Sequence, residues 1–468
     1  ADASIAADDA PGTPADWAPT VLSGGNVSVV SSVYDSPIRS DASSAINSNE
    51  EGTGGAPTTT DAAGVAIAVG LFDHVSHATI GRNVTVQAAN VGVAAHSDSP
   101  LSFGWVNAET PNEMMMAVTS AINGNLGVVN NVVTGYAAST VKSRDLGIAG
   151  SWNYIGISHD TLAWIGSGAS ITTTAAADAD GWEASIDTDG GRGTAGTHDF
   201  ASGVDVHASS STQTVNIAGS PAWLLVLGGN ESQGDEGTAA GGSFNHAQFL
   251  TTTVAGIGDG VEITTPAAVR VNAETRDETF TITPSSGKGG AYGFNGLVTY
   301  VEIDNRTHAT ISNRALITAP EVEVAARQES LIVSAAGAMT QSTGTSVGLA
   351  GAWSSFTADT RAYIGDNSDL VEGTDLANFA GTGPGVITAD AVRAAALTAG
   401  ANHTLSVAAS VAAPRTGNPG FVDKVKVGVG NYLASSSFAS VGKAGEKMTR
   451  LPDGQWRDFS LAGAGSVS

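Results

Sequence analysis

The chain has 468 residues with 59 Gly, 15 Pro and no Cys, and only 14% of its residues are charged, against about 25% in an average domain. Hydrophobic residues make up 41% and glycine has no three-residue period, so the composition excludes a disordered chain and a collagen helix. Its 45 acidic and 20 basic residues leave a formal net charge of −25, which disfavours nucleic acid and anionic lipid as partners.

Residues 1–63 are expected to form first rungs or an irregular lead-in to a repeat array. They include "DDAPGTPADW" and "NSNEEGTGGAPTTTD", which are rich in the residues that favour turns. Repeat-like sequence begins at the first residue, and the last stretch, "SLAGAGSVS", continues it without a cap. We therefore expect a segment of a longer chain.

A short phrase recurs through residues 64–442, with a Ser or Thr, a fixed Ala, a β-branched residue and a final Gly or Ser. Its copies are "SHATIG", "TLAWIG", "TVAGIG", "THATIS", "TRAYIG" and "SFASVG", with a weaker copy around Gly135 and Ala137. Ile257 to Ile311 is 54 residues and Ile311 to Ile364 is 53, so the repeat has a real period. Fixed-period repetition is typical of stacked modules.

Alternating runs flank the phrase on both sides, such as "GVAIAVGLFDHV" before it and "ALITAPEVEVAA" after it. Alternation of β-branched and polar residues between Gly, Asn and Asp predicts strands with one buried face. The small inward residues fit the narrow interior of stacked parallel rungs, and the final Gly is expected to turn a corner with positive φ. We predict an all-β parallel β-helix over residues 64–442, with about 20 rungs of roughly 20–25 residues in a rod on the order of 100 Å long.

Loop inserts are expected near residues 99–125, 178–245 and 366–385. Within the first, Thr110, Pro111 and Glu113 form a capping box that predicts a short helix ending near Gly124, with a strand as the alternative. Residues 443–468 are expected to be last, truncated rungs. Because they restart the repeat, we expect the segment either to associate end to end through them or to be followed there by another rung-forming segment.

Two acidic turns are calcium candidates. "DADGWEASIDTDGG" offers Asp187 and Asp189, and "GDNSDLVEGTD" offers Asp366 and Asp369. Calcium takes six to eight oxygen ligands, which loops of Asp, Asn and Gly supply. The alternative is that both stretches are solvated turns, since Asp and Asn favour turns in any case.

The histidines argue against zinc. His74, His77 and His96 lie in one module, but residues 74 and 77 point to opposite faces of a strand, and no Cys completes a set. His77 and His308 occupy the same slot of the phrase. Because that slot varies between copies, we expect both to point outward.

The succession of a Gly/Ala-rich strand, "A-x-I-G", "I-T-A" and "V-x-V-x-A" resembles the repeat region of large bacterial secreted adhesins of the filamentous haemagglutinin type. The resemblance extends from about Gly64 to Gly442. It implies a right-handed parallel β-helix displayed at the cell surface as an extracellular filament. Absence of Cys suits export of an unfolded chain.

The expected function is that of a structural or adhesive segment of a secreted fibrous protein, making surface or self-association contacts. Its expected partners are further segments of the same chain or identical chains, and a surface glycan or protein receptor. The alternative is a polysaccharide-binding or polysaccharide-degrading β-helix. We expect no enzyme, because the chain has few Lys and Arg to hold an acidic polymer and no His-Glu-x-x-His motif.

Overall fold

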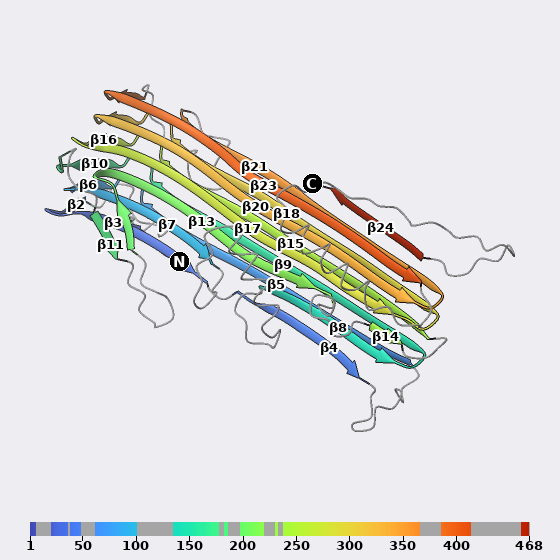
Figure 1. Cartoon of the computed structure of the whole chain (residues 1–468). Helices are drawn as coiled ribbons and strands as arrows, with labels where there is room; N and C mark the ends of the chain where they lie inside the picture. Colours follow the sequence, from blue (N-terminus) through green and yellow to red (C-terminus); the bar gives the residue numbers. More distant parts are fainter. Residues whose placement is uncertain are drawn as a thin grey trace.

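The computed structural model describes residues 1–5, 20–35, 38–47, 61–100, 134–176, 182–185, 197–219, 230–232, 237–365, 385–412 and 460–467. Within these ranges every regular element is a β-strand (Figure 1). The same ranges hold no helix with the length and hydropathy needed to cross a membrane.

Nearly all of the strands belong to three parallel sheets. Sheet A contains β1 (Asp2–Ile5), β5 (Asp61–Ile80), β9 (Leu146–Ile165), β15 (Thr238–Ile257), β18 (Tyr292–Ile311), β21 (Thr345–Ile364) and β24 (Ser460–Val467). Sheet B contains β2 (Thr20–Leu22), β6 (Thr85–Ala88), β10 (Ser170–Thr173), β16 (Glu262–Thr264), β19 (Leu316–Thr318) and β22 (Val386–Thr388). Sheet C contains β3 (Val27–Tyr34), β4 (Ser40–Asn47), β7 (Val91–Ser99), β8 (Gly135–Ser143), β13 (Gly203–Ala218), β14 (Asn230–Ser232), β17 (Ala268–Lys288), β20 (Glu321–Ser342) and β23 (Ala391–Ala412).

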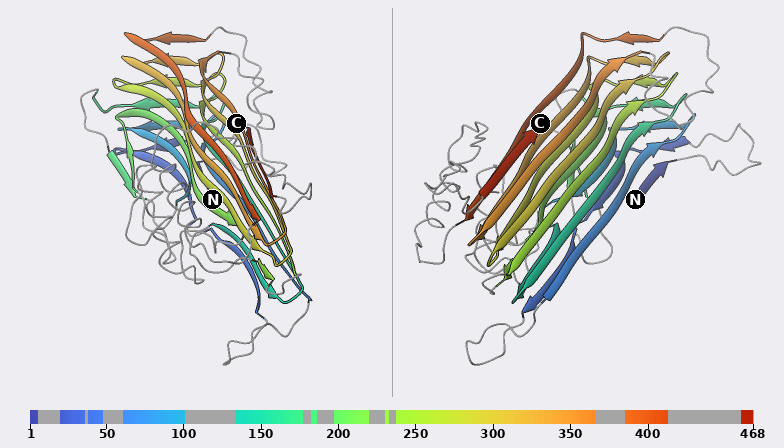
Figure 2. Two further views of the ribbon diagram at one scale, coloured as in Figure 1. Left: turned by 45° about the vertical axis from the view of Figure 1, so that its right-hand side comes forward. Right: turned by 90° about the vertical axis from the view of Figure 1, so that its right-hand side faces the viewer.

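The chain passes from sheet A through the short sheet B to sheet C and then returns to sheet A one strand further along. For example, β15, β16 and β17 form one rung, and β18 opens the next by pairing with β15. Figure 2 shows the rungs stacked in sequence order, from the N-terminal blue strands to the C-terminal orange ones. The predicted parallel β-helix is therefore confirmed.

Each rung is longer than predicted. Ile257 pairs directly with Ile311, so a single rung takes 54 residues, and sheet A holds 7 strands where about 20 rungs were expected. The prediction was wrong because the alternating run and the phrase lie in one strand of 20 residues, not in separate short strands. Seven strands stack to roughly 30 Å, less than the roughly 65 Å length of such a strand, so the described body is a slab, not a rod.

The repeated phrase forms continuous columns through sheet A. Ala78, Ala163, Ala255 and Ala309 are paired in turn, and each is 0% exposed. The isoleucines two positions later form a second buried column. The weaker copy at Gly135 is not part of these columns, because β8 lies in sheet C.

The final glycine of the phrase has the expected positive φ at Gly365, where φ is 143°, but not at Gly81, Gly166 or Gly258. The left-handed residues come two positions later, at Asn83, Gly168, Gly260 and Arg314, with φ of 54°, 72°, 65° and 59°. A Cβ on Gly166 would lie 2.7 Å from the backbone of Gly81 in the rung before it. The glycine is thus needed for close stacking of successive corners, and the turn itself falls on the residue two positions further on.

Two kinds of side chain fill the interior. Near sheet B the core is a cluster of Ala, Val and Ile from all three sheets. Further from sheet B, hydroxyl groups link sheets A and C in a zigzag along the stack, from Thr161 to Ser210, Thr253, Thr275 and Thr307, with successive oxygen distances of 2.8, 2.9, 2.9 and 2.8 Å. Each hydroxyl of this zigzag therefore has a partner on the facing sheet.

The expected inserts are placed only in part. Residues 99–125 fall between β7 and β8, and residues 366–385 fall between β21 and β22, so both ranges interrupt the ladders at the expected points. The range 178–245 is not one insert, because it contains β13, β14 and the start of β15. The helix expected near Thr110 to Gly124 lies outside the described residues.

Two antiparallel strands, β11 (Trp182–Ser185) and β12 (Thr197–Phe200), form a pair outside the three sheets. They occupy the connection between β10 of sheet B and β13 of sheet C. The end of the chain returns to the stack, because β24 pairs with Ser346–Trp353 of β21.

His308 corrects a second expectation. It lies on the outward face of β18, as expected, but it is not a surface residue: it is 1% exposed, with its Nε2 atom 3.2 Å from Asp359 of the next rung. His77, in the same slot, keeps 33% side-chain exposure. Burial lowers the pKa of His308, and the carboxylate of Asp359 opposes that effect. The slot varies between copies because its neighbours in each rung differ.

Ile311→Asp should destabilise the protein by about 3–5 kcal/mol, because Ile311 is 0% exposed and the substitution leaves a buried carboxylate without a partner. Val298→Asp is the matched control, since Val298 lies on the same strand, is 44% exposed and points outward. Urea unfolding of the two variants makes the comparison. Equal losses of stability would contradict the inward and outward faces assigned to β18.

Asp277 should make stability depend on pH. It is 2% exposed, and burial raises its pKa from 3.8 to about 7 despite hydrogen bonds from Asn305 and Thr212. The folded protein therefore keeps a proton that the unfolded chain loses above about pH 4, so this contribution to stability is present below pH 4 and is lost as pH rises to about 7.

Asp277→Asn should accordingly raise the melting temperature at pH 8 and have little effect at pH 4, as measured by thermal unfolding at both pH values. The exposed Asp304→Asn serves as the control and should change neither. If Asp277→Asn is no more stable than the parent protein at pH 8, then ionisation of the buried Asp277 carboxyl does not destabilise the folded state.

Candidate metal centre

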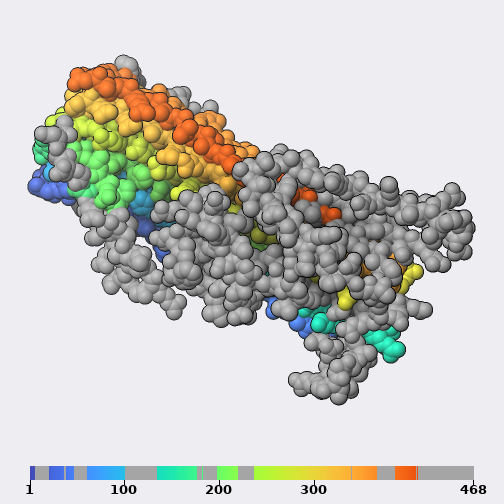
Figure 3. All heavy atoms as spheres, in the orientation of Figure 1, coloured from blue at the N-terminus to red at the C-terminus, as the bar shows by residue number. Residues whose placement is uncertain are grey.

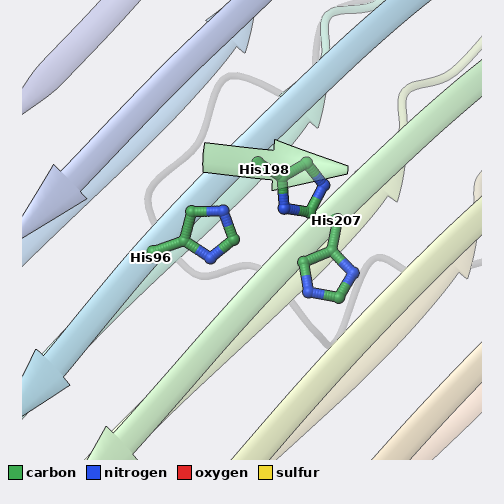
Figure 4. Close-up of side chains that lie close together, drawn as sticks. All are labelled: His96, His198 and His207. Carbon is green, nitrogen blue, oxygen red and sulfur yellow. The ribbon is translucent and has the colours of Figure 1, made fainter. Parts of the chain in front are cut away.

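The described residues contain one group of side chains with the composition of a metal site. His96 of β7, His198 of β12 and His207 of β13 place one ring nitrogen each within 4.8 Å of the others. Figure 4 shows the three rings gathered where the short strand β12 meets the two neighbouring strands of sheet C. No other group of three potential ligands this close occurs among the described residues.

The register between β7 and β13 brings His96 and His207 together. β7 and β13 are adjacent in sheet C, with Val93 paired to Val206 and Ser209 paired to His96. Since side chains alternate between faces along a strand, His96 and His207 both point to the outer face while Val93 and Val206 point inward. The two rings lie 5.6 Å apart between centroids.

The hairpin β11–β12 supplies the third histidine. Phe200 packs on Ala94 of β7 and stacks on Trp182 with centroids 4.5 Å apart, which holds β12 against the sheet. Gly92 makes this contact possible, because a Cβ there would lie 2.6 Å from the Phe200 ring. Past the hairpin, Asp205 accepts a hydrogen bond from the amide of Ala201 at 2.8 Å. His198 is thereby placed 4.7 Å from His96 and 4.9 Å from His207 between centroids.

Two nitrogens of the group lack protein partners. Nε2 of His96 and Nε2 of His198 are buried and accept or donate no hydrogen bond. The other nitrogen of His96, Nδ1, lies 2.7 Å from Oγ of Ser209, which sets the orientation of the ring. A buried polar atom without a partner costs free energy, so it points to a ligand or serves as a marker of function.

Burial keeps the rings uncharged at neutral pH. Burial, with a smaller effect from the neighbouring rings, lowers the pKa of His96 to about 4 and that of His207 to about 3. The pKa of His198 is also lowered, mainly by burial, and Asp199 opposes the effect. Neutral imidazole is the form that donates a lone pair to a metal.

The argument against zinc considered His74, His77 and His96 as one set, and among the described residues these three do not come together at one site. His74 points into the interior, and His77 lies on the opposite face beside Asp160. His96 does belong to a cluster, but with His198 and His207, which the sequence argument missed. The available signal was "VDVHA" at residues 204–208, a further copy of the V-x-V-x-A run, which aligns with "VGVAA" at residues 91–95.

The calcium candidates Asp187, Asp189, Asp366 and Asp369 lie outside the described residues. Calcium binding at these four residues therefore stays a prediction.

A second histidine group lies inside the solenoid and has the residue types of a catalytic triad. Oγ of Ser99 is 3.4 Å from Nδ1 of His74, whose Nε2 is 3.1 Å from Asp35, and Oγ also lies 3.3 Å from Nε2 of His159. Ser99 is 2% exposed and His159 is 1% exposed. The hydroxyl of Ser99 therefore lies buried between two sheets, while Asp35 keeps 48% side-chain exposure.

The pattern Gly-x-Ser-x-Gly occurs at residues 344–348, as "GTSVG". A nucleophile of this motif needs a sharp turn between a strand and a helix that exposes the hydroxyl. Ser346 instead lies in β21, where it is 0% exposed and pairs with Gly293. The geometry at Ser346 does not fit hydrolase chemistry.

No protein family, curated protein or solved structure matches this chain.

Proposed function

We propose that this chain is a structural and adhesive segment of a secreted, surface-displayed fibrous protein, and that it makes contact through the outer face of sheet A. The observation that carries the proposal is a broad apolar area on that face. It comprises the outward-facing residues within 63–69, 148–154, 240–246, 294–300 and 347–353, and we call it the apolar face.

The apolar face spans five adjacent strands and contains no Asp, Glu, Lys or Arg. Several of its large side chains are well exposed: Ile67 is 54%, Val298 is 44% and Trp353 is 55% exposed. Aromatic side chains make edge contacts along it, including Trp152 with Phe244 at 6.5 Å between centroids. Such an area on a chain of net charge −25 supports a docking role, because isolated proteins seldom expose large contiguous apolar areas.

A second copy of the chain is the occupant that the face favours. Strand spacing of about 4.8 Å and about 6.7 Å between alternate residues give an area on the order of 500 Å². Two copies face to face would bury on the order of 1,000 Å², the lower limit for a specific interface. A nearly flat, regular face is also self-complementary under two-fold rotation. Lateral pairing of this kind bundles fibres or joins fibres from neighbouring cells.

Polysaccharide binding is the second candidate, favoured by a track of glycines within the apolar face. Gly150, Gly242 and Gly296 align across three rungs, and a Cβ on Gly296 would meet nothing within 4 Å. Trp152 and Phe294 flank the track, and aromatic rings of this kind stack on sugars. A shallow depression of about 220 Å³ lies beside it, lined in part by Leu71, Tyr154 and Gln248.

Phe244→Lys should weaken self-association at least tenfold, because it places a charge within the contact on β15. Sedimentation velocity across a concentration series is the measurement, and association of the parent protein should strengthen with salt because copies of net charge −25 repel. Thr252→Lys, an outward residue of the same strand outside the apolar face, adds the same charge and should associate like the parent protein.

A parent protein that stays monomeric, with glycan binding that Phe244→Lys abolishes, would replace self-association with the polysaccharide alternative. A monomer that binds no glycan would overturn the adhesive role.

A further inference from the structure

We propose that His96, His198 and His207 bind one divalent transition-metal ion of the zinc class, and that the ion fastens the hairpin β11–β12 to the outer face of sheet C. This site is on the opposite sheet from the apolar face and does not depend on the proposed adhesive role.

The ligand set selects the kind of metal. Imidazole nitrogens suit zinc, copper, nickel and cobalt, whereas calcium and magnesium require oxygen ligands that this group lacks. Three histidines with one open position form a common zinc arrangement, with water as the fourth ligand. All three residues keep part of their surface exposed to solvent.

The geometry is close to that required. Zinc–nitrogen bonds of about 2.0–2.1 Å at tetrahedral angles place ligand nitrogens about 3.4 Å apart. The three ring nitrogens already lie within 4.8 Å of one another, so small side-chain rotations bring them onto one ion. The Nε2 atoms of His96 and His198 are buried and have no other hydrogen-bond partner. A bound metal would give a partner to each nitrogen that coordinates it.

Ser209 fits the role of a positioning residue. With Nε2 of His96 on the metal, the proton of that ring resides on Nδ1, which donates to Oγ of Ser209 at the observed distance of 2.7 Å. Such outer partners fix the tautomer and orientation of a metal-bound histidine. Phe200 and Gly92 position His198 in turn, because their contact seats β12 on the sheet.

The metal would join parts of the chain that are far apart in sequence. His96 and His207 belong to successive rungs, and His198 belongs to the hairpin between β10 and β13. An ion held by all three closes the hairpin onto the sheet and links two rungs. Metal binding to the folded state alone then stabilises that state by mass action.

The test is titration of the metal-free protein with zinc by isothermal calorimetry, with the visible spectrum of bound cobalt as a report on ligand geometry. We expect one zinc per chain, a higher melting temperature that a chelator reverses, and slower hydrogen exchange in residues 182–185 and 197–200. His207→Ala and His96→Ala should abolish this binding. His246→Ala, a partly buried histidine on sheet A, should leave it unchanged.

Two further variants leave the histidines in place. Ser209→Ala should weaken zinc binding about tenfold or more through loss of the positioning contact. Gly92→Ala should weaken it by crowding Phe200 and displacing the hairpin, while circular dichroism stays that of the parent protein. Absence of zinc binding, binding that survives both His96→Ala and His207→Ala, or calcium binding as tight as zinc at this site would each overturn the proposal.

Discussion

Parallel strands in register place every residue directly beside its counterpart in the next rung, about 4.8 Å away, and this constraint governs the rest of the molecule. An inward residue must fit against a copy of its own slot, so the columns become Ala on Ala and Ile on Ile, as in Ala255 on Ala309 and Ile257 on Ile311. Polar slots obey the same rule by hydrogen bonding along the column, as when Asn153 donates to Asn245 at 2.8 Å. In the described residues, the connections between strands fall at corners or at the points where the sheet C strand is divided in the first three rungs, as β3/β4, β7/β8 and β13/β14.

The same register also decides what the outer faces can do. When a position is apolar in several successive rungs, its side chains form a continuous apolar column across the sheet. Neighbouring columns of this kind together form the apolar face of sheet A. On sheet C the outer face is more varied, and a two-residue offset between His96 and His207 places unlike residues in contact. The hairpin then adds His198 from above, so one candidate contact surface and one candidate metal site arise on opposite sides of the slab.

Much of the fold could be predicted from sequence because the repeated phrase records the stacking directly. The buried Ala and Ile slots, the alternation and the parallel β-helix all follow from it. The rung length was missed although the 54-residue spacing of Ile257 and Ile311 equals it, because a run of twenty alternating residues looks the same whether it forms one strand or several short ones. Likewise, slot variation at His308 indicated an exposed position, yet its contact with Asp359 depends on the neighbouring rung.

The candidate metal site was harder to predict from the sequence than the fold. His198 and His207 join His96 only once the register of β7 and β13 is known and the hairpin is seated by Phe200. The spacing of the three histidines along the sequence does not indicate that they lie close together. The only sequence signal is the V-x-V-x-A run, which aligns β7 with β13. The calcium candidates, among them Asp187 and Asp366, were predicted from the local composition of two acidic stretches alone.

Disulfide cross-linking tests the 54-residue in-register rung most directly, since the chain has no Cys of its own. Leu250 and Asp304 are paired across β15 and β18, so the double variant Leu250→Cys, Asp304→Cys should form an intramolecular disulfide under mild oxidation. The pair Leu250→Cys, Val298→Cys joins the same two strands six residues out of register, roughly 20 Å apart, and should not. Rungs of 20–25 residues would separate Leu250 and Asp304 by at least two rungs. Failure of the first pair to cross-link in the folded protein would therefore contradict the account.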